Sequence, residues 1–304
     1  MGRHRTQTPK TIEWPTIFVA AGCWGGWIAI LVWHDRLPWP LVLVGFALVA
    51  GWYMSLQHEV IHGHPTPWRA LNAALVIVPR SLWLPFAIYR DTHLDHHKVE
   101  LTVPGVDPES FYVSPADWRT ASPVRRELLR VNRTFLGRLI IGPMIGPPAL
   151  VWSELKRART SRAAMRTWAL HVVLVAAVGW VVFGLANVPV WQYLLGYSYL
   201  GMSVTYIRSF VEHLAVPAPA TRCAVVRSGR FFGLLFLNNN LHLTHHEVPA
   251  AAWYRLPALT ADLGSADTAA AGAGYYRGYI EVMRRYGIRP FSQAVDPLAE
   301  SVHA

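Results

Sequence analysis

Residues 39–62 read WPLVLVGFALVAGWYMSLQHEVIH. The first part of this stretch, residues 39–56, carries no charged side chain, and about 20 mainly apolar residues are enough for a helix to cross a membrane. His58 and His62 follow directly and are four residues apart, a spacing that places two side chains on one face of a continuing helix. The stretch therefore predicts a membrane-spanning helix that ends in two imidazoles able to meet at one centre.

The composition of the whole chain is that of a membrane protein. Hydrophobic residues make up 53% of the 304 residues and charged residues 15%, whereas a soluble domain carries about 25% charged residues. The mean hydropathy is +0.24, and the 14 tryptophans suit the aromatic belts at membrane interfaces. The net charge of +10 comes from basic residues that flank apolar runs and form no separate basic module, so we exclude nucleic-acid binding.

Three further stretches share the length and polarity of residues 39–56. The four predicted spans cover residues 12–33, 39–56, 168–186 and 190–210. Residues 34–38 alone join the first two spans, and residues 187–189 alone join the last two. Short links of this kind predict two helical hairpins.

Two other apolar runs, Ala73–Tyr89 and Leu139–Trp152, are interrupted by proline. As a helix, the second run would be about 21 Å long, shorter than the roughly 30 Å of a membrane core. Clusters of arginine and lysine also lie on both sides of it, and a crossing would put one cluster on the wrong side of the membrane. We therefore predict that both runs are interfacial or re-entrant segments.

Nine of the 14 histidines form a pattern typical of a metal centre. They are His58, His62, His93, His96, His97, His213, His242, His245 and His246. Within each box, spacings of three or four residues place the imidazoles on one helix face. Neutral imidazole binds iron, zinc, copper or nickel, and nine imidazoles are too many for one ion but suit two ions with four or five ligands each. Because neither cysteine lies in a box, we exclude iron–sulfur clusters and cysteine-ligated zinc.

Ligating imidazoles also need a hydrogen-bond acceptor for the second ring nitrogen. Glu59, Asp95 and Glu212 lie beside the boxes and are candidates for that role. His64 is a further candidate ligand, although its two-residue spacing from His62 points it to another face of a helix. The remaining histidines are interpreted as polar residues outside the metal centre: His4, His34, His171 and His303.

The predicted fold class is an all-α integral membrane protein, with four transmembrane helices in two hairpins, interfacial or re-entrant helices, and a cytoplasmic histidine-rich cap that holds two metal ions. The positive-inside rule puts the N-terminus, residues 57–165 and the chain from residue 211 onward in the cytoplasm, so we expect a multi-pass protein of a bacterial inner membrane. We predict a single domain over residues 1–304, with a histidine-box core at 52–257 and a cytoplasmic tail at 258–304.

The three boxes, in this order around two predicted hairpins, resemble the membrane fatty-acid desaturase superfamily, which includes acyl-lipid desaturases, fatty-acid and alkane hydroxylases and carotenoid ketolases. The resemblance extends over residues 52–257. Members carry a lone histidine ligand after the fourth span, which here corresponds to His213. Stearoyl-type desaturases place an asparagine four residues before that histidine, but this chain has Ser209 there. Asn238, four residues before His242, is an alternative outer ligand.

The resemblance implies two iron ions as cofactors, O₂ as co-substrate, and a fatty-acyl desaturase that inserts a double bond into an apolar substrate taken from the bilayer. A hydroxylase or ketolase of a lipid or carotenoid is the alternative, because the same kind of site can add oxygen instead. A metal-binding membrane protein without turnover, such as a transporter, is disfavoured. A transporter needs ionisable groups in mid-membrane, and the predicted spans offer there only His171, with Arg208 near an end.

The remaining expectations concern partners. Candidate walls of a substrate tunnel are the aromatic residues of the spans, such as Trp52, Tyr53, Tyr197, Tyr199 and Tyr206. Electrons have to come from another protein, because the sequence contains no haem-binding motif, no rubredoxin-type cysteine set and no dinucleotide fingerprint. A small acidic carrier such as a ferredoxin would suit the basic cytoplasmic face.

Overall fold

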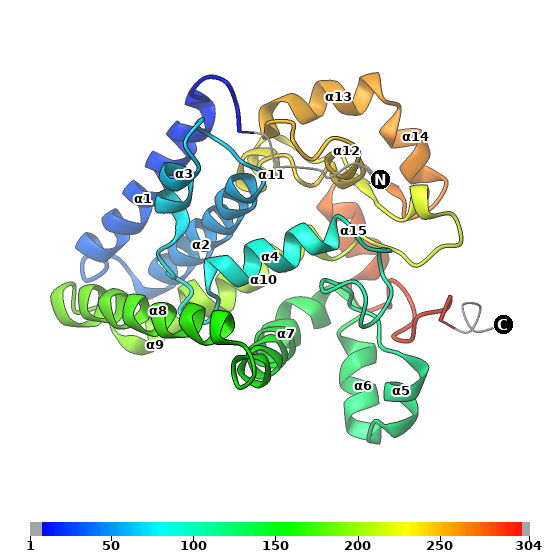
Figure 1. Cartoon of the computed structure of the whole chain (residues 1–304), viewed down its shortest axis with the longest axis horizontal. Helices are drawn as coiled ribbons and strands as arrows, with labels where there is room; N and C mark the ends of the chain where they lie inside the picture. Colours follow the sequence, from blue (N-terminus) through cyan, green and yellow to red (C-terminus); the bar gives the residue numbers. More distant parts are fainter. Residues whose placement is uncertain (1–7, 300–304) are drawn as a thin grey trace. The chain divides into compact units, whose positions relative to one another are not determined.

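A computed structural model describes residues 8–299, and Figure 1 labels its elements. The described chain is mainly helical, which confirms the predicted class, and its strands are two short ones that pair with each other. The described residues form two compact units: unit 1 comprises residues 8–90 and 143–205, and unit 2 comprises residues 91–142 and 206–299. The single-domain organisation stays a prediction, and His4 and His303 lie outside the described residues.

Unit 1 is built from long apolar helices and the segments that link them. Its elements are α1 (Trp14–Trp33), α2 (Trp39–Ile61), α3 (Arg69–Val76), α8 (Arg162–Gly179), the π-helix η1 (Trp180–Leu185), α9 (Val190–Tyr193) and the π-helix η2 (Leu194–Leu200). Three helices contribute residues to both units: α4 (Phe86–His96), α7 (Phe135–Ala158) and α10 (Gly201–Ser209). A proline lies in the first turn of α1 and of α2. The backbone N–H groups of a first turn have no acceptor within the helix, so the N–H that proline lacks costs no hydrogen bond there.

Among residues 8–299, four helices are long and apolar enough to cross a membrane: Trp14–Trp33, Trp39–Ile61, Phe135–Ala158 and Arg162–Leu185. The first, second and fourth confirm predicted spans with shifted ends. α2 continues to Ile61, past the predicted end at Leu56, because Gln57 to Ile61 are themselves buried and keep the helical hydrogen bonding. The first histidine box therefore belongs to the same helix as the second span.

The run Leu139–Trp152, predicted to be an interfacial or re-entrant segment, belongs to a longer helix than its apolar residues indicate, and its place in the membrane stays a prediction. That run lies inside α7, one continuous helix of 24 residues that is about 36 Å long. Counting only the uninterrupted apolar run underestimated the helix, because its backbone hydrogen bonding continues through polar residues at both ends. Three prolines lie inside α7, and each removes one backbone donor without ending the helix. The run is thus part of a candidate membrane span.

The predicted span at residues 190–210 is helical but is not one α-helix. α9, η2 and α10 follow one another from Val190 to Ser209, with a π-helical segment in the middle. This stretch is therefore not among the four candidate spans, and the membrane orientation of the chain stays a prediction.

The core of unit 1 lies between its long helices. α1 and α2 lie side by side in Figure 1, and Trp27 of α1 and Phe46 of α2 share one buried apolar cluster with Tyr193. A Cβ added to Gly201 would lie 2.4 Å from the Cβ of Ala50, so glycine is what allows α10 to approach α2 so closely.

The segment between α3 and α4 carries a fully buried arginine. Two prolines, Pro79 and Pro85, help to keep residues 77–85 out of a helix. The guanidinium carbon of Arg80 lies 3.9 Å from the ring centroid of Trp24 and 4.0 Å from that of Tyr53. Its Nη1 donates a hydrogen bond of 2.9 Å to the carbonyl of Cys23. Arg80 therefore holds this segment against α1 and α2.

Unit 2 is made of short helices and loops. Its further elements are α5 (Pro115–Thr120), α6 (Pro123–Val131), the 3₁₀-helix η3 (Pro219–Thr221), β1 (Val225–Val226), α11 (Arg230–Leu235), α12 (His242–Glu247), the 3₁₀-helix η4 (Trp253–Arg255), α13 (Leu256–Asp262), α14 (Ser265–Ala270), β2 (Tyr275–Tyr276) and α15 (Tyr279–Tyr286). β1 and β2 are parallel, with Val225 opposite Tyr275. Val225 and Leu243 belong to a small buried cluster that anchors α12 beneath this pair of strands.

We expect Arg80→Ala to lower the free energy of unfolding by roughly 2–4 kcal/mol, because it removes a desolvated cation–π stack and leaves a cavity. The midpoint of thermal unfolding in detergent measures the effect. Arg36→Ala is the matched control, because Arg36 is exposed and its loss should change stability by less than about 0.5 kcal/mol. Equal shifts for the two variants would contradict the role of the Arg80 stack.

Candidate metal centre

The first histidine box lies in unit 1. His58 is in the last turn of α2 and His62 is the residue that caps it. Their ring centroids are 4.9 Å apart, and each residue is only 4% exposed. The predicted sharing of one helix face is confirmed for this box.

The second box lies at the end of α4, within unit 2. His93 and His96 are helical, and the N–H of His97 still donates to the carbonyl of His93, so the helical spacing continues for one more residue. The Nε2 atoms of His93 and His97 are 3.1 Å apart. His93 and His96 are almost fully buried.

The third box and the lone histidine meet elsewhere in unit 2. α12 carries His242, His245 and His246, and the Nε2 atoms of His242 and His246 are 3.1 Å apart. His213 forms an isolated antiparallel bridge with Cys223, which brings its Nε2 to 3.0 Å from that of His242. The predicted ligand role of His213 is therefore supported by its position beside the third box.

Two groups of imidazoles form in unit 2. His96, His213, His242 and His246 each present one nitrogen, and these nitrogens lie within 4.8 Å of one another. His93, His97 and His245 do the same, and the Nε2 atoms of His97 and His245 are 3.1 Å apart. The second and third boxes are about half the chain apart in sequence, and each contributes imidazole nitrogens to both groups.

Carboxylates fix the protonation of several rings. His93 Nδ1 donates to Glu109 at 2.9 Å, and His96 Nδ1 donates to Asp107 at 2.7 Å. His242 Nδ1 lies 3.4 Å from the carboxylate of Glu212 and 3.3 Å from the amide oxygen of Asn239. An ionised carboxylate can only accept, so the proton of neutral His93 and of neutral His96 is on Nδ1, and the Nε2 lone pair of each ring is bare.

The distances between the facing Nε2 atoms indicate whether a metal ion fits between the rings. Facing Nε2 atoms at 3.0–3.1 Å share either a proton, when one of the two rings carries it on Nε2, or a cation. Two nitrogens bound to a metal at about 2.1 Å and at right angles are about 3.0 Å apart. His96 Nε2 is also buried, with no hydrogen-bond partner among residues 8–299. The donor set therefore fits an imidazole-ligated transition metal in each group.

The electrostatics of the site differ between the rings. Burial opposes protonation of His96, but the charge of Glu109 and the hydrogen bond to Asp107 raise its pKa above the usual value. Burial, together with the neighbouring imidazoles, lowers the pKa of His97 to about 2 and that of His213 to about 3. Burial opposes ionisation of Glu109, but the charges of His93 and His96 and the hydrogen bond from His93 hold its pKa below the usual range. Neutral rings backed by ionised carboxylates are the form that binds a metal ion.

The candidate residues beside the boxes have different surroundings. Glu212 is buried, faces His242 and forms an ion pair with Arg208, and burial raises its pKa to about 7 despite the charge of Arg208. Asp95 is exposed and pairs with Lys98, so it does not orient an imidazole. Asn238 donates to the carbonyl of Trp253, and it is the next residue, Asn239, that faces His242.

His64 and Glu59 belong to a small group of their own in unit 1. His64 Nδ1 lies 2.7 Å from the carboxylate of Glu13, and His64 Nε2 lies 4.0 Å from that of Glu59. The N–H of Glu13 donates to the carbonyl of Pro65, so this group ties the start of α1 to the loop after the first box. Two other histidines that were predicted to be non-ligands contact backbone carbonyls: His34 that of Leu31 and His171 that of Leu82.

Sequence reasoning missed four residues: Glu13, Asp107, Glu109 and Asn239. A signal for two of them was present, because Asp107 and Glu109 follow the second box at a distance that a short loop can close. No comparable signal marks Glu13, whose partner is 51 residues away.

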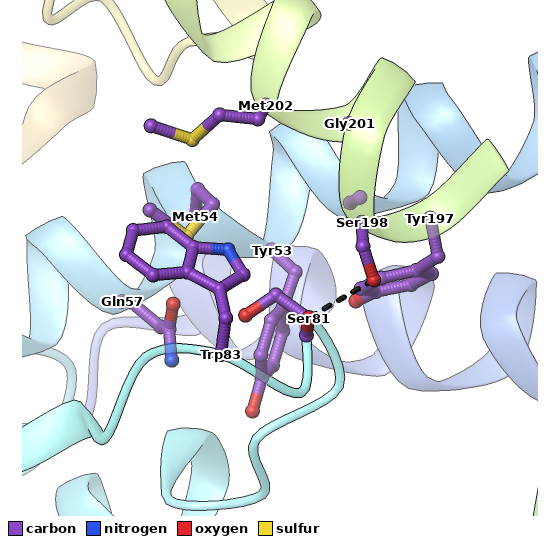
Figure 2. Close-up of a pocket in the computed structure, with 10 residues that line it drawn as sticks. Tyr53, Met54, Gln57, Ser81, Trp83, Tyr197, Ser198, Gly201 and Met202 are labelled. Carbon is purple, nitrogen blue, oxygen red and sulfur yellow. Dashed lines mark hydrogen bonds between the residues drawn. The ribbon is translucent and has the colours of Figure 1, made fainter. Parts of the chain in front are cut away.

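A small pocket lies inside unit 1, and Figure 2 shows its lining. Tyr53 and Tyr197, two of the predicted tunnel aromatics, line it together with Trp83. Ser198 Oγ donates to the carbonyl of Ser81 at 2.9 Å across its wall. A mainly apolar pocket with a few polar groups is typical of a site for part of an apolar molecule.

Comparison with known proteins bears on this arrangement. A family model described as fatty acid desaturase matches residues 32–279, which include all nine histidines of the boxes and the lone site. No curated protein matches the chain.

We expect His96→Ala and His246→Ala each to reduce the metal bound per chain by at least half, because each removes a ligand from the four-imidazole group. Inductively coupled plasma mass spectrometry of the purified protein measures the loss. His171→Ala should retain the metal content of the parent protein. Unchanged metal in both ligand variants would contradict the site.

Replacing the acceptors should weaken the site without removing a ligand. Glu109→Gln and Asp107→Asn are expected to lower metal affinity by about 10- to 100-fold, because the rings of His93 and His96 lose the negative charge that orients them. Competition with a chelator measures the affinity, and Asp95→Asn is the matched control. A similar loss in the Asp95 variant would show that general surface charge is responsible.

Proposed function

The chain belongs to the fatty acid desaturase family, and we propose that it is an O₂-dependent membrane oxidoreductase that holds two iron ions and inserts a double bond into a fatty-acyl chain. The observation that carries this proposal is the set of facing imidazole nitrogens in unit 2, which is compatible with metal binding. The family match supports the choice of iron and of a lipid substrate.

Nine histidines are the proposed ligands. The group of His96, His213, His242 and His246 would hold one ion. His93, His97 and His245 would bind the other. We add His58 and His62 on the basis of their spacing, their burial and the position of their box inside the family match.

Bound iron would supply the activation of O₂ that is needed to break an unactivated C–H bond. The residues of the chain provide the setting. Glu109 and Asp107 hold the rings of His93 and His96 in place through Nδ1, so the ligand geometry does not have to reorganise during turnover. Burial of His93, His96, His242 and His245 keeps bulk water away from the ligand nitrogens.

The apolar helices of unit 1 support a substrate that enters from the bilayer. Gln57, which lines the pocket beside Tyr53, directly precedes His58 of the first box in the chain. We propose that the chain is a multi-pass protein with its termini and histidine boxes on the cytoplasmic side, which the positions of arginine and lysine support.

The test is product analysis with the purified, iron-loaded protein, a lipid extract, O₂ and a chemical reductant. We expect about two iron ions per chain and a product that has lost two hydrogen atoms, as measured by mass spectrometry. His96→Ala should abolish product, whereas His171→Ala should not. Gain of one oxygen would assign hydroxylation or ketolation, and one zinc per chain with no product would overturn the proposal.

A further inference from the structure

The lone histidine His213 differs from the carboxylate-backed rings of unit 2 in the group that faces its second nitrogen. His96, in the same four-imidazole group, donates through Nδ1 to Asp107. Among residues 8–299, no carboxylate forms an ion pair with His213, and the sulfur of Cys223 lies 3.5 Å from its Nδ1. We propose that Cys223 is a positioning residue that holds the His213 ring for metal binding; the inference rests on the proposed function.

The backbone places the thiol beside the ring. His213 and Cys223 form an isolated antiparallel bridge. The N–H of the residue after each member of this pair donates to the carbonyl of the residue before the other member, at 3.0 Å and 2.9 Å. A pair flanked in this way is of the non-hydrogen-bonded type, in which the two side chains lie closest together. The contact between sulfur and imidazole therefore follows from the strand register.

The segment that carries Cys223 is also tied to the third box. The carbonyl of Ala224 accepts from the N–H of Leu243 at 3.1 Å, and Leu243 follows His242 in α12. Cys223 and Leu243 belong to the same buried apolar cluster. The sulfur therefore has a defined position relative to α12, whose His242 presents its Nε2 at 3.0 Å from that of His213.

Cys223 backs the ring and is not itself a ligand of the group. His213 faces His242 through Nε2 and faces the sulfur through Nδ1, the other nitrogen of the ring. A neutral imidazole that binds a metal through Nε2 carries its proton on Nδ1. That N–H then points at the sulfur, which accepts it, although sulfur is a weak acceptor.

Burial makes this acceptor hard to replace. Cys223 is 2% exposed, so bulk water does not reach the place that its side chain fills. An N–H that loses its acceptor in such a place stays unpaired, which costs free energy. Because a thiol has no charge to offer, we expect its effect on metal affinity to be at the lower end of the range for groups that orient a ligand.

Three substitutions at one position separate this role from packing. Cys223→Ala and Cys223→Ser both shorten or shrink the side chain, but serine keeps a hydrogen-bond acceptor and alanine does not. Cys223→Val fills the space without an acceptor. Cys23→Val is the matched control, because Cys23 is the other buried cysteine and lies in unit 1.

The test titrates each purified, full-length variant with Co²⁺ in competition with a chelator and records the visible absorption bands of the bound ion. The bands that disappear in His246→Ala identify the four-imidazole group. For that group we expect Cys223→Ala and Cys223→Val to raise the Kd about tenfold and to shift the bands. Cys223→Ser should keep the Kd within about threefold of the parent value, since a hydroxyl also accepts, and Cys23→Val should leave it unchanged.

The outcomes separate this inference from the proposed function. Equal Kd values for Cys223→Ala and Cys223→Ser would overturn the positioning role, and so would an equal rise in Cys23→Val and Cys223→Val. A parent protein that bound no Co²⁺ would overturn the metal centre, and the proposed function with it. Thermal unfolding without metal shows which variants are folded, and if Cys223→Val does not fold, the comparison of alanine with serine decides. Because Co²⁺ replaces iron, the result does not depend on which reaction the protein catalyses.

Discussion

The arrangement of unit 2 centres on imidazole nitrogens that face one another at 3.0–3.1 Å, in a region from which water is largely excluded. Hydrogen bonds from the opposite ring nitrogens to Asp107 and Glu109 hold two of the rings in place. A cation bound between these nitrogens would stabilise the folded unit, so metal affinity and the stability of unit 2 would be thermodynamically linked.

The two units solve different solvation problems. Unit 1 places most of its described backbone in helices, which satisfies the peptide groups where lipid offers no partner. Its one fully buried cation in the linking segments, Arg80, is stabilised by aromatic faces. Unit 2 instead uses short capped helices and many side-chain hydrogen bonds, as at Ser114 and Ser122. That polar architecture can surround ionised carboxylates and neutral imidazoles, which an apolar bundle could not.

Local properties of the site were predictable from the sequence, and long-range ones were not. Spacings of three and four residues suffice to place His58 with His62 and His242 with His246, because helical periodicity is local. The choice of Asn239 over Asn238 depends on the positive φ of Asn238, which turns the chain just before α12. Hydropathy also mistook α7 for a short segment, since it counts apolar residues, whereas the length of a helix is decided by its backbone hydrogen bonds. The fold class, the helical histidine boxes and three of the four candidate spans could therefore be predicted from the sequence. The acceptors that pair with the second nitrogen of each imidazole and the ends of the helices could not.

The sequence separations within the site have a consequence for how the protein folds. His96 and Asp107 are 11 residues apart, and His93 and Glu109 are 16 apart, so these contacts close short loops at low entropic cost. The contact of His97 with His245 spans 148 residues. Local contacts form sooner than distant ones, so we expect the second box to be oriented by its carboxylates while the third box is still being synthesised. The emerging chain would then expose the oriented imidazoles of the second box before those of the third box are synthesised. Such an incomplete site could bind a different metal ion before the remaining ligands are in place.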